Sequence, residues 1–258
     1  GPHEGQPGDA DHAGPRVPVR RPEGPDLAQG DAADHGVLQA GFLAQLAPGR
    51  RFEVFNSAAG QEFPVSMEGF GALAVLGGEM SVNDELPSLR RAEDLIRQSL
   101  SRDLPVIGHC LGGQLMATAL GARVAASPAP EIGWQSATVH GHAQAREWFG
   151  DVDEVTVFHW HHEAFELPPG AVALAGSVAC AHQAFAIGRH LAMQFHVEVD
   201  ADKLARWSAS RDPAFLQLQQ SCPTVQSGEA MRAMAGHCLE AQQALARRLY
   251  ARWLVGAC

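Results

Sequence analysis

The sequence predicts an α/β fold with three layers, in which helices cover both faces of a mostly parallel central sheet. Up to residue 120, short apolar runs typical of buried strands alternate with segments whose apolar residues recur at helical spacing. Later in the chain, several strand-like runs follow one another with tight turns, which indicates antiparallel additions to the sheet. A length of 258 residues with 46% hydrophobic residues is sufficient for one sizeable domain.

The first half supplies the alternation of strands and helices. Pro87 precedes one helical pattern, where a proline fits because the first helical residues need no N–H donor. Glycines follow other segments, as at Gly49 and Gly121, and end them. The predicted elements are a helix at 37–47, strands at 52–55 and 72–76, a helix at 89–100, a strand at 106–108 and a helix at 111–120.

The second half has a different pattern, because its apolar runs are short and lie close together. The predicted strands are 137–139, 155–158, 172–175, 185–187 and 191–195. Beyond residue 200 the patterns are helical, with predicted helices at 204–207, 231–239 and 241–254. We expect residues 36–200 to form the main domain and residues 201–258 to form a helical extension packed on it.

The N-terminal 35 residues are rich in Gly, Pro, Asp and Ala and almost lack large apolar side chains. This composition predicts a disordered or irregular segment at residues 1–35. The nearest candidate for a strand is Val17-Pro18-Val19, but its proline cannot donate a hydrogen bond to a neighbouring strand.

Charge and cysteine usage exclude several classes of partner and compartment. A net charge of −10 argues against nucleic acid and anionic membrane surfaces, which would repel the chain. No apolar run reaches the length of a membrane span, and the N-terminus lacks an apolar signal core. Five cysteines without Cys-x-x-Cys spacing suit a reducing compartment. We therefore expect a cytoplasmic protein.

The segment Gly108-His109-Cys110-Leu111-Gly112 carries the most chemical information. It joins a predicted strand to a predicted helix, and small residues flank the cysteine, as in a nucleophile elbow. This turn places Cys110 at a helix N-terminus, which favours a thiolate. The N–H of Leu111 is then well placed to stabilise an oxyanion.

A base and its orienting group follow in Gln194-Phe195-His196-Val197-Glu198. His196 can accept and return a proton near neutral pH, and Glu198 can hold its imidazole in one tautomer. The order Cys110, His196, Glu198 predicts a catalytic triad for acyl transfer.

These two motifs resemble those of the class I, triad-type glutamine amidotransferases, which carry Gly-x-Cys-Leu-Gly-x-Gln and Gln-Phe-His-Pro-Glu. Within that family the chain is most similar to stand-alone members of the GMP synthase-like kind. The resemblance is strong over residues 70–200 and implies a flavodoxin-like fold with the catalytic domain at 36–200. Further matching segments are 76–84, Glu131-Ile132-Gly133-Trp134, Phe158-His159-Trp160-His161 and Gln183-Ala184-Phe185.

The chain departs from the family pattern at two positions near these motifs. Val197 replaces the usual proline between His196 and Glu198, which removes no functional group. Glu79 stands where the family commonly has proline, and a carboxylate there can change which substrate is accepted.

The resemblance also implies further site residues. Gly77 and Gly78 supply, with Leu111, the backbone N–H groups of the oxyanion hole. Gln114 lies one helical turn after Cys110 and is assigned to glutamine binding. The segment His159-Trp160-His161 is expected to contact the amino-acid end of the substrate. His159, His161 and His162 are clustered, and on an extended segment His159 and His161 would share one face. No third ligand lies at diagnostic spacing from these two, so we expect no metal. No cofactor is predicted.

Three functions remain open. The first is hydrolysis of the γ-amide of glutamine through a Cys110 γ-glutamyl thioester, with ammonia passed to an unknown acceptor, such as a separate synthetase, or released. The second is hydrolysis of γ-glutamyl amines or peptides. The third is a catalytically silent domain that binds a partner or an amino-acid ligand.

Overall fold

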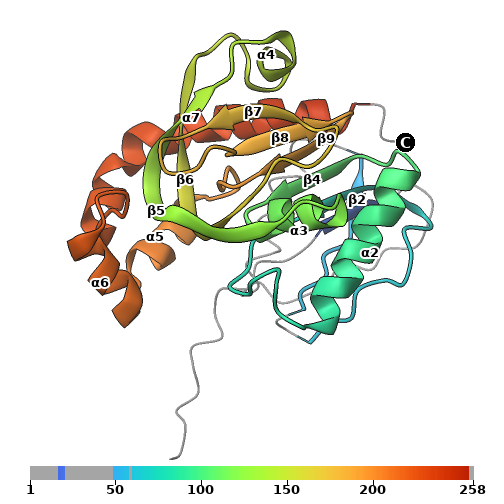
Figure 1. Ribbon diagram of the computed structural model, residues 1–258, viewed down its shortest axis with the longest axis horizontal. Coiled ribbons are helices and arrows are strands. Elements are labelled where there is room, and N and C mark those ends of the chain that lie inside the picture. The colour runs from blue at the N-terminus through green and yellow to red at the C-terminus, as the bar shows by residue number, and fades with distance from the viewer. Residues whose placement is uncertain (1–16, 21–48, 58–59, 256–258) are drawn as a thin grey trace, which may run out of the picture.

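The computed structural model describes residues 17–20, 49–57 and 60–255. These residues form one sheet of nine strands in the order β2-β1-β3-β4-β9-β8-β7-β5-β6 (Figure 1). Its centre is parallel: β3 (Phe70–Val75) pairs with β4 (Val106–His109), which pairs with β9 (His190–Met193). The helix α2 (Pro87–Ser101) connects β3 to β4, as a crossover between parallel strands requires.

The outer strands are antiparallel. One long ribbon pairs β5 (Val124–Val139) with β6 (Glu154–Phe165), and β7 (Val172–Gly176) joins β5 to β8 (Ala184–Ile187). β8 returns directly to β9 as a hairpin. The predicted α/β class, with its parallel centre and antiparallel additions, is confirmed. The antiparallel share of this mixed sheet is larger than the sequence indicates, because short turns, rather than helical crossovers, join most strands after β5.

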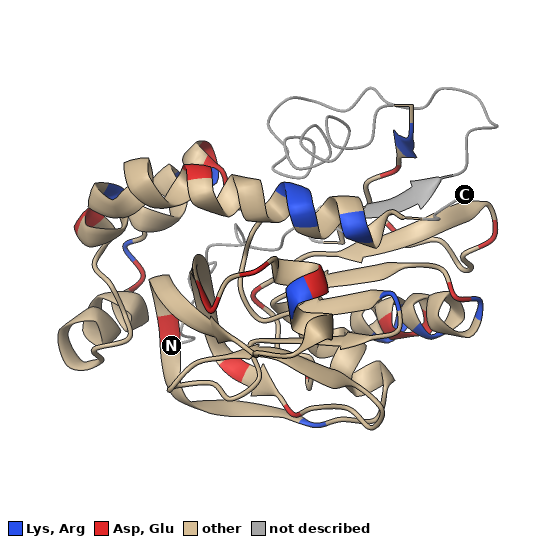
Figure 2. Ribbon diagram, turned by 90° about the horizontal axis from the view of Figure 1, so that it is seen from above, with Lys and Arg blue, Asp and Glu red and all other residues tan. Residues whose placement is uncertain are grey.

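Helices cover both faces of the sheet, which confirms the three layers. On one face, apolar residues of α2 and α3 (Leu111–Ala119) pack on β3 and β4. On the other face, α4 (Ala143–Phe149) and α7 (Gly228–Trp253) bury Trp148, Tyr250 and Trp253 against the sheet. Basic and acidic residues occur together on α7 (Figure 2). No helix among the described residues is both long enough and apolar enough to cross a bilayer.

A third apolar cluster fixes the C-terminal helices beside the β5–β6 ribbon. α5 (Ala201–Ser208) and α6 (Pro213–Ser221) contribute Leu204 and Phe215, which pack with Trp134 and Phe158. The two helices predicted at 231–239 and 241–254 are one continuous helix, α7. Residues 201–255 thus lie against the same sheet as the elbow.

Two short helices were not predicted. α6 begins with Asp212, whose side chain accepts the N–H of Ala214, and with Pro213 in the first turn. These are ordinary start signals, but the helix buries only Phe215, so it has no apolar stripe. α4 starts at a His142 cap that hydropathy does not reveal.

The N-terminal predictions are only partly covered. Within residues 1–35 the structure describes β1 (Val17–Arg20), which lies between β2 (Arg51–Phe52) and β3 and pairs antiparallel with both. Pro18 stands opposite Leu73, so the proline does not prevent strand pairing here. The rest of 1–35, and the helix predicted at 37–47, lie outside the described residues.

Candidate active site

Cys110 lies at the turn from β4 into α3 with a backbone φ of 51° and ψ of −111°. A non-glycine residue at positive φ is strained, and such strain is held in place by its surroundings. The N–H of Cys110 donates to the carbonyl of Met193 at 2.8 Å, which ties the turn to β9. A Cβ on Gly112 would lie 2.0 Å from the carbonyl oxygen of Val75. The glycine therefore lets α3 approach β3, as the elbow motif predicts.

His196 and Glu198 follow β9 and form a buried pair. Nδ1 of His196 lies 2.7 Å from Oε1 of Glu198, and the two residues are 3% and 6% exposed. The Cys110 side chain lies close enough to the His196 ring to raise the pKa of that ring. The structure thus brings Cys110, His196 and Glu198 together in the order that the sequence predicts.

Electrostatics favour a protonated His196 in the resting site. Burial lowers the pKa of His196, but the Glu198 carboxylate and Cys110 together raise it to about 9. Burial raises the pKa of Glu198, yet His196 and Lys203 outweigh burial and hold that pKa well below its usual range. At neutral pH this arrangement matches an imidazolium between a carboxylate and the cysteine sulfur.

The loop after β3 closes the other side of Cys110. A Cβ on Gly77 would lie 2.7 Å from Cε1 of His196 and 3.5 Å from Cβ of Cys110. A Cβ on Gly78 would lie 3.0 Å from Cδ2 of Leu111. Gly77, Gly78 and Leu111 therefore surround Cys110, and the lack of a side chain at Gly77 leaves room for the His196 ring.

Gln114 of α3 and Trp160 of β6 connect the surroundings of Cys110 to β6. The N–H of Gln114 donates to the Cys110 carbonyl at 2.9 Å, and its Nε2 donates to the carbonyl of Glu163 at 3.0 Å. The Sγ of Cys110 lies 3.6 Å from the carbonyl oxygen of Trp160 and 3.8 Å from Nε2 of Gln194. The Trp160 ring instead packs on Trp207 and Phe215.

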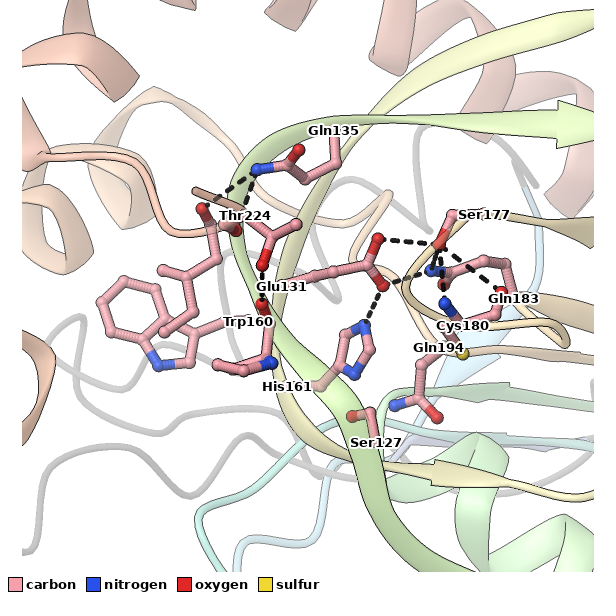
Figure 3. Close-up of polar contacts among 12 residues, drawn as sticks. Ser127, Glu131, Gln135, Trp160, His161, Ser177, Cys180, Gln183, Gln194 and Thr224 are labelled. Atoms are coloured by element: carbon pink, nitrogen blue, oxygen red, sulfur yellow. Dashed lines mark hydrogen bonds and ion pairs between the residues drawn. The ribbon is translucent and has the colours of Figure 1, made fainter. Parts of the chain in front are cut away.

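His159 and His161 project from the opposite face of β6 and are buried. Nε2 of His161 lies 3.0 Å from Oε2 of Glu131, and Nδ1 lies 3.1 Å from the carbonyl oxygen of Glu163. Glu131 also accepts hydrogen bonds from Ser177 and Gln183 (Figure 3). The side chain of His161 therefore belongs to a buried hydrogen-bond network, and the His159 ring packs beside it with centroids 5.6 Å apart. Trp160 faces Cys110 through its carbonyl.

Glu131, His159 and His161 are also the described residues best placed to hold a metal ion. Their ligand atoms lie within 4.8 Å of one another, and Glu131 is the third ligand that the sequence did not reveal. However, both oxygens of Glu131 and both nitrogens of His161 already have hydrogen-bond partners within the chain. By contrast, burial lowers the pKa of His159 to about 3, so its ring is neutral, which is the form in which imidazole can bind a metal. The absence of a metal stays a prediction.

The structure adds residues that sequence reasoning missed. Nζ of Lys203 lies 3.5 Å from Oε1 of Glu198, and Nε2 of His109 lies 2.8 Å from the hydroxyl of Tyr250. Trp207 meets the His196 ring edge to face, with centroids 5.0 Å apart. Lys203 and Trp207 come from α5, which begins three residues after Glu198, and the sequence does not show that this helix turns toward the triad.

Comparisons with known proteins find one family and several similar proteins. The family model described as glutamine amidotransferase class-I matches residues 49–205, which include the elbow, β9 and the His196–Glu198 pair. The glutamine amidotransferase-like protein YfeJ of Salmonella typhimurium is 34% identical over 172 residues, covering 62% of this chain and 72% of that protein. A glutamine-hydrolyzing GMP synthase subunit of Thermoplasma acidophilum is 29% identical over 144 residues, covering 54% of this chain and 69% of that protein.

A solved structure extends the likeness beyond the matched domain. The crystal structure of a glutamine amido transferase from Methylobacillus flagellatus superposes with a TM-score of 0.77 at 34% identity. The superposition covers 84% of this chain and 88% of that one. The similarity therefore includes most of the sheet and of the helices that cover it.

Proposed function

Since this chain belongs to the class-I glutamine amidotransferase family, we propose that it hydrolyses the γ-amide of glutamine with Cys110 as nucleophile. His196 serves as general acid and base, and Glu198 holds the His196 ring. The observation that carries this proposal is the position of Cys110, held at positive φ on the elbow, beside a buried His196 that lies 2.7 Å from Glu198.

The first half of the reaction forms a thioester. The Cys110 sulfur attacks the γ-carbonyl carbon, and the oxyanion accepts hydrogen bonds from the N–H groups of Leu111 and of the Gly77–Gly78 turn. The His196 imidazolium gives its proton to the leaving nitrogen as the C–N bond breaks, and ammonia departs. The γ-glutamyl group remains on Cys110.

The second half returns the site to its starting state. His196 is now neutral and takes a proton from a water molecule, whose oxygen attacks the thioester carbon. The C–S bond breaks, glutamate is released, and Cys110 leaves as the thiolate beside the His196 imidazolium.

Substrate binding is assigned to residues around the sulfur. Gln114 lies one turn of α3 after Cys110, and the carbonyl of Trp160 faces Sγ at 3.6 Å. We propose that these groups contact the amino-acid end of glutamine. His159 and His161 then do not contact the substrate; they help to hold β6 in place, because their side chains are buried with Glu131.

The ammonia acceptor is proposed to be a separate synthetase protein. The likeness to the GMP synthase subunit of Thermoplasma acidophilum supports a partner of this kind. The proposed setting is cytoplasmic, where glutamine and such a partner would meet.

A second candidate is hydrolysis of larger γ-glutamyl amines or peptides. The aromatic side chains of Trp160, Trp207 and Phe215 pack together beside His196, which protonates the leaving nitrogen. An apolar group on that nitrogen would contact these rings. A catalytically silent domain is the third reading, and it predicts that Cys110 reacts no faster with iodoacetamide than the other cysteines.

Glutamate release tests these proposals directly. Wild type, Cys110→Ala and a control, Cys222→Ala, are incubated with glutamine and with a panel of γ-glutamyl amides and peptides. We expect release from glutamine that disappears only in Cys110→Ala. Release from γ-glutamyl peptides but not from glutamine would support the second candidate. Equal release by wild type and Cys110→Ala would contradict the mechanism.

A further inference from the structure

Lys203 is a buried cation beside the triad. Its side chain is 9% exposed, and Nζ lies 3.5 Å from Oε1 of Glu198. The same oxygen lies 2.7 Å from Nδ1 of His196. Taking an ammonium out of water is costly unless partners compensate, so a lysine buried against one carboxylate is unusual. Among the described residues, two basic side chains, those of His196 and Lys203, lie within 4.0 Å of the Glu198 carboxylate.

The start of α5 places this ammonium. The Asp200 side chain caps the helix by accepting the N–H of Lys203 at 2.7 Å. Nζ then lies 4.6 Å from the centre of the Trp207 ring, which itself packs edge to face on His196. Lys203 is thereby held against both the carboxylate and the ring that contact His196.

Other charged and titratable groups around His196 come from several elements. Cys110 lies on the elbow, His109 on β4 and His159 on β6, while Tyr250 of α7 lies near Glu198. Burial lowers the pKa of His109 to about 4 and that of His159 to about 3, so both rings are neutral. Lys203 is therefore the second cation that contacts Glu198 beside His196; burial lowers the pKa of its ammonium, although the Glu198 carboxylate opposes this.

We propose that Lys203 is a positioning residue that shares Oε1 of Glu198 with His196 and thereby makes it easier for His196 to lose its proton. This inference rests on the proposed glutamine hydrolysis. Glu198 orients His196 but also stabilises the imidazolium. A second cation on the same oxygen weakens that stabilisation, because the carboxylate charge is divided between two partners.

The neutral His196 ring matters most when water attacks the thioester. In that step a proton moves from water to His196, the new C–O bond forms, and the C–S bond then breaks to release the Cys110 thiolate. Only the neutral ring can accept the proton. Lys203 should therefore support thioester hydrolysis, measured by kcat, more than thioester formation, measured by kcat/KM.

The test compares three variants across neutral and alkaline pH. Lys203→Met removes the charge but keeps a long apolar side chain, Lys203→Arg keeps the charge, and Arg206→Met removes an exposed cation from the same helix. A rise of about one unit in the midpoint of His196 titration lowers the neutral fraction about tenfold at neutral pH. We expect Lys203→Met to lower kcat about tenfold at neutral pH and to recover at alkaline pH, with kcat/KM changing less.

Lys203→Arg and Arg206→Met should both keep the wild-type pH profile. An unchanged profile in Lys203→Met, or a loss that is equal at every pH and not rescued by arginine, would overturn the proposal.

A readout without turnover separates this proposal from the proposed function. In the Cys110→Ala background, NMR follows the titration of the His196 ring, whose signals are assigned by comparison with His196→Gln. Lys203→Met should move the midpoint to higher pH, while Lys203→Arg should not. If wild type releases no glutamate but the midpoint moves, the proposed function fails and the role of Lys203 stands. If wild type is active and the midpoint does not move, the role of Lys203 fails.

Discussion

The described part of the chain contains two buried pairs of a histidine and a glutamate, and they differ in what the rest of the histidine ring meets. His196 lies 2.7 Å from Glu198, and its ring lies beside Cys110 next to Gly77. His161 lies 3.0 Å from Glu131, but its other nitrogen faces the backbone carbonyl of Glu163 at 3.1 Å. In His196 one ring nitrogen remains for a nucleophile, whereas both ring nitrogens of His161 have partners within the protein. A buried pair of this kind therefore supports catalysis only where the fold leaves one ring nitrogen for a reacting group.

The residues around the two pairs differ in the same way as the ring nitrogens do. Around His196 the chain provides glycine backbone at Gly77, which leaves room for the ring, and a cysteine at positive φ. Around His161 the chain provides Ser177 and Gln183, which complete the hydrogen bonds of Glu131 (Figure 3). The first region suits the proposed proton transfer, whereas the second links β5 and β6 through side-chain hydrogen bonds.

The largest expected difference comes from removing each histidine. His196→Gln should lower glutamate release about 10²- to 10⁴-fold, because it removes the general acid and base. His161→Gln should keep most of the activity but lower the free energy of unfolding by about 1–3 kcal/mol, because a buried carboxylate loses a partner. Steady-state kinetics and urea denaturation of both variants measure the two effects. A reversed pattern, with His161→Gln inactive but fully stable, would break the distinction.

A smaller effect is expected from filling the space beside His196. In Gly77→Ala the new Cβ would lie 2.7 Å from the His196 ring, which must then move away from Cys110. We expect glutamate release to fall about 10- to 100-fold, since misplacement of a catalytic group is costly. Gly141→Ala is the control, because its Cβ meets no atom within 4 Å. Equal activity in the two variants would show that Gly77 does not limit the site.

The pH dependence of stability should also distinguish the two regions. The pKa of His196 is raised from 6.5 to about 9, so its contribution is complete below pH 6.5 and is lost as the pH rises through 9. The pKa of His159, beside His161, is lowered from 6.5 to about 3, so the unfolded state binds the proton more tightly and stability is lost as the pH falls below 6.5. Urea denaturation across this range tests both signs.

Two variants assign these slopes to their residues. His196→Gln should flatten the alkaline side of the stability curve, and His159→Gln should flatten the acid side. Curves that stay parallel to that of wild type in both variants would contradict the assignment.

The smallest expected effect is that of a chelator. The hydrogen bonds of Glu131 and His161 are made by protein groups, so dialysis against EDTA should change neither glutamate release nor the melting temperature. Metal analysis of the purified protein provides the control. Bound metal in about equal amount to protein, with a lower melting temperature after dialysis, would make this region a metal site.

The sequence alone determined the elements that depend on local pattern. Helical spacing of apolar residues predicted α2 and α3, and the Gly-x-Cys-x-Gly turn placed Cys110 at the elbow between β4 and α3. The spacing of two residues between His196 and Glu198 indicated a pair, and their side chains meet in the turn that follows β9. These predictions succeeded because each depends on neighbours within a few residues along the chain.

The tertiary structure decided which distant groups meet. The order of the outer strands, β8-β7-β5-β6, depends on how the turns between them fold, so hydropathy could not show which strands pair. The pairing of His161 with Glu131 depends on the register of β5 and β6, across 30 residues of chain. Lys203 is close to Glu198 along the chain, but the direction of α5, which is capped by Asp200 and packs on Phe158 through Trp207, brings its ammonium to the carboxylate. The physical reason is the same in each case: local pattern fixes which face of an element is apolar, while the choice of its partner is made by the packing of the whole core.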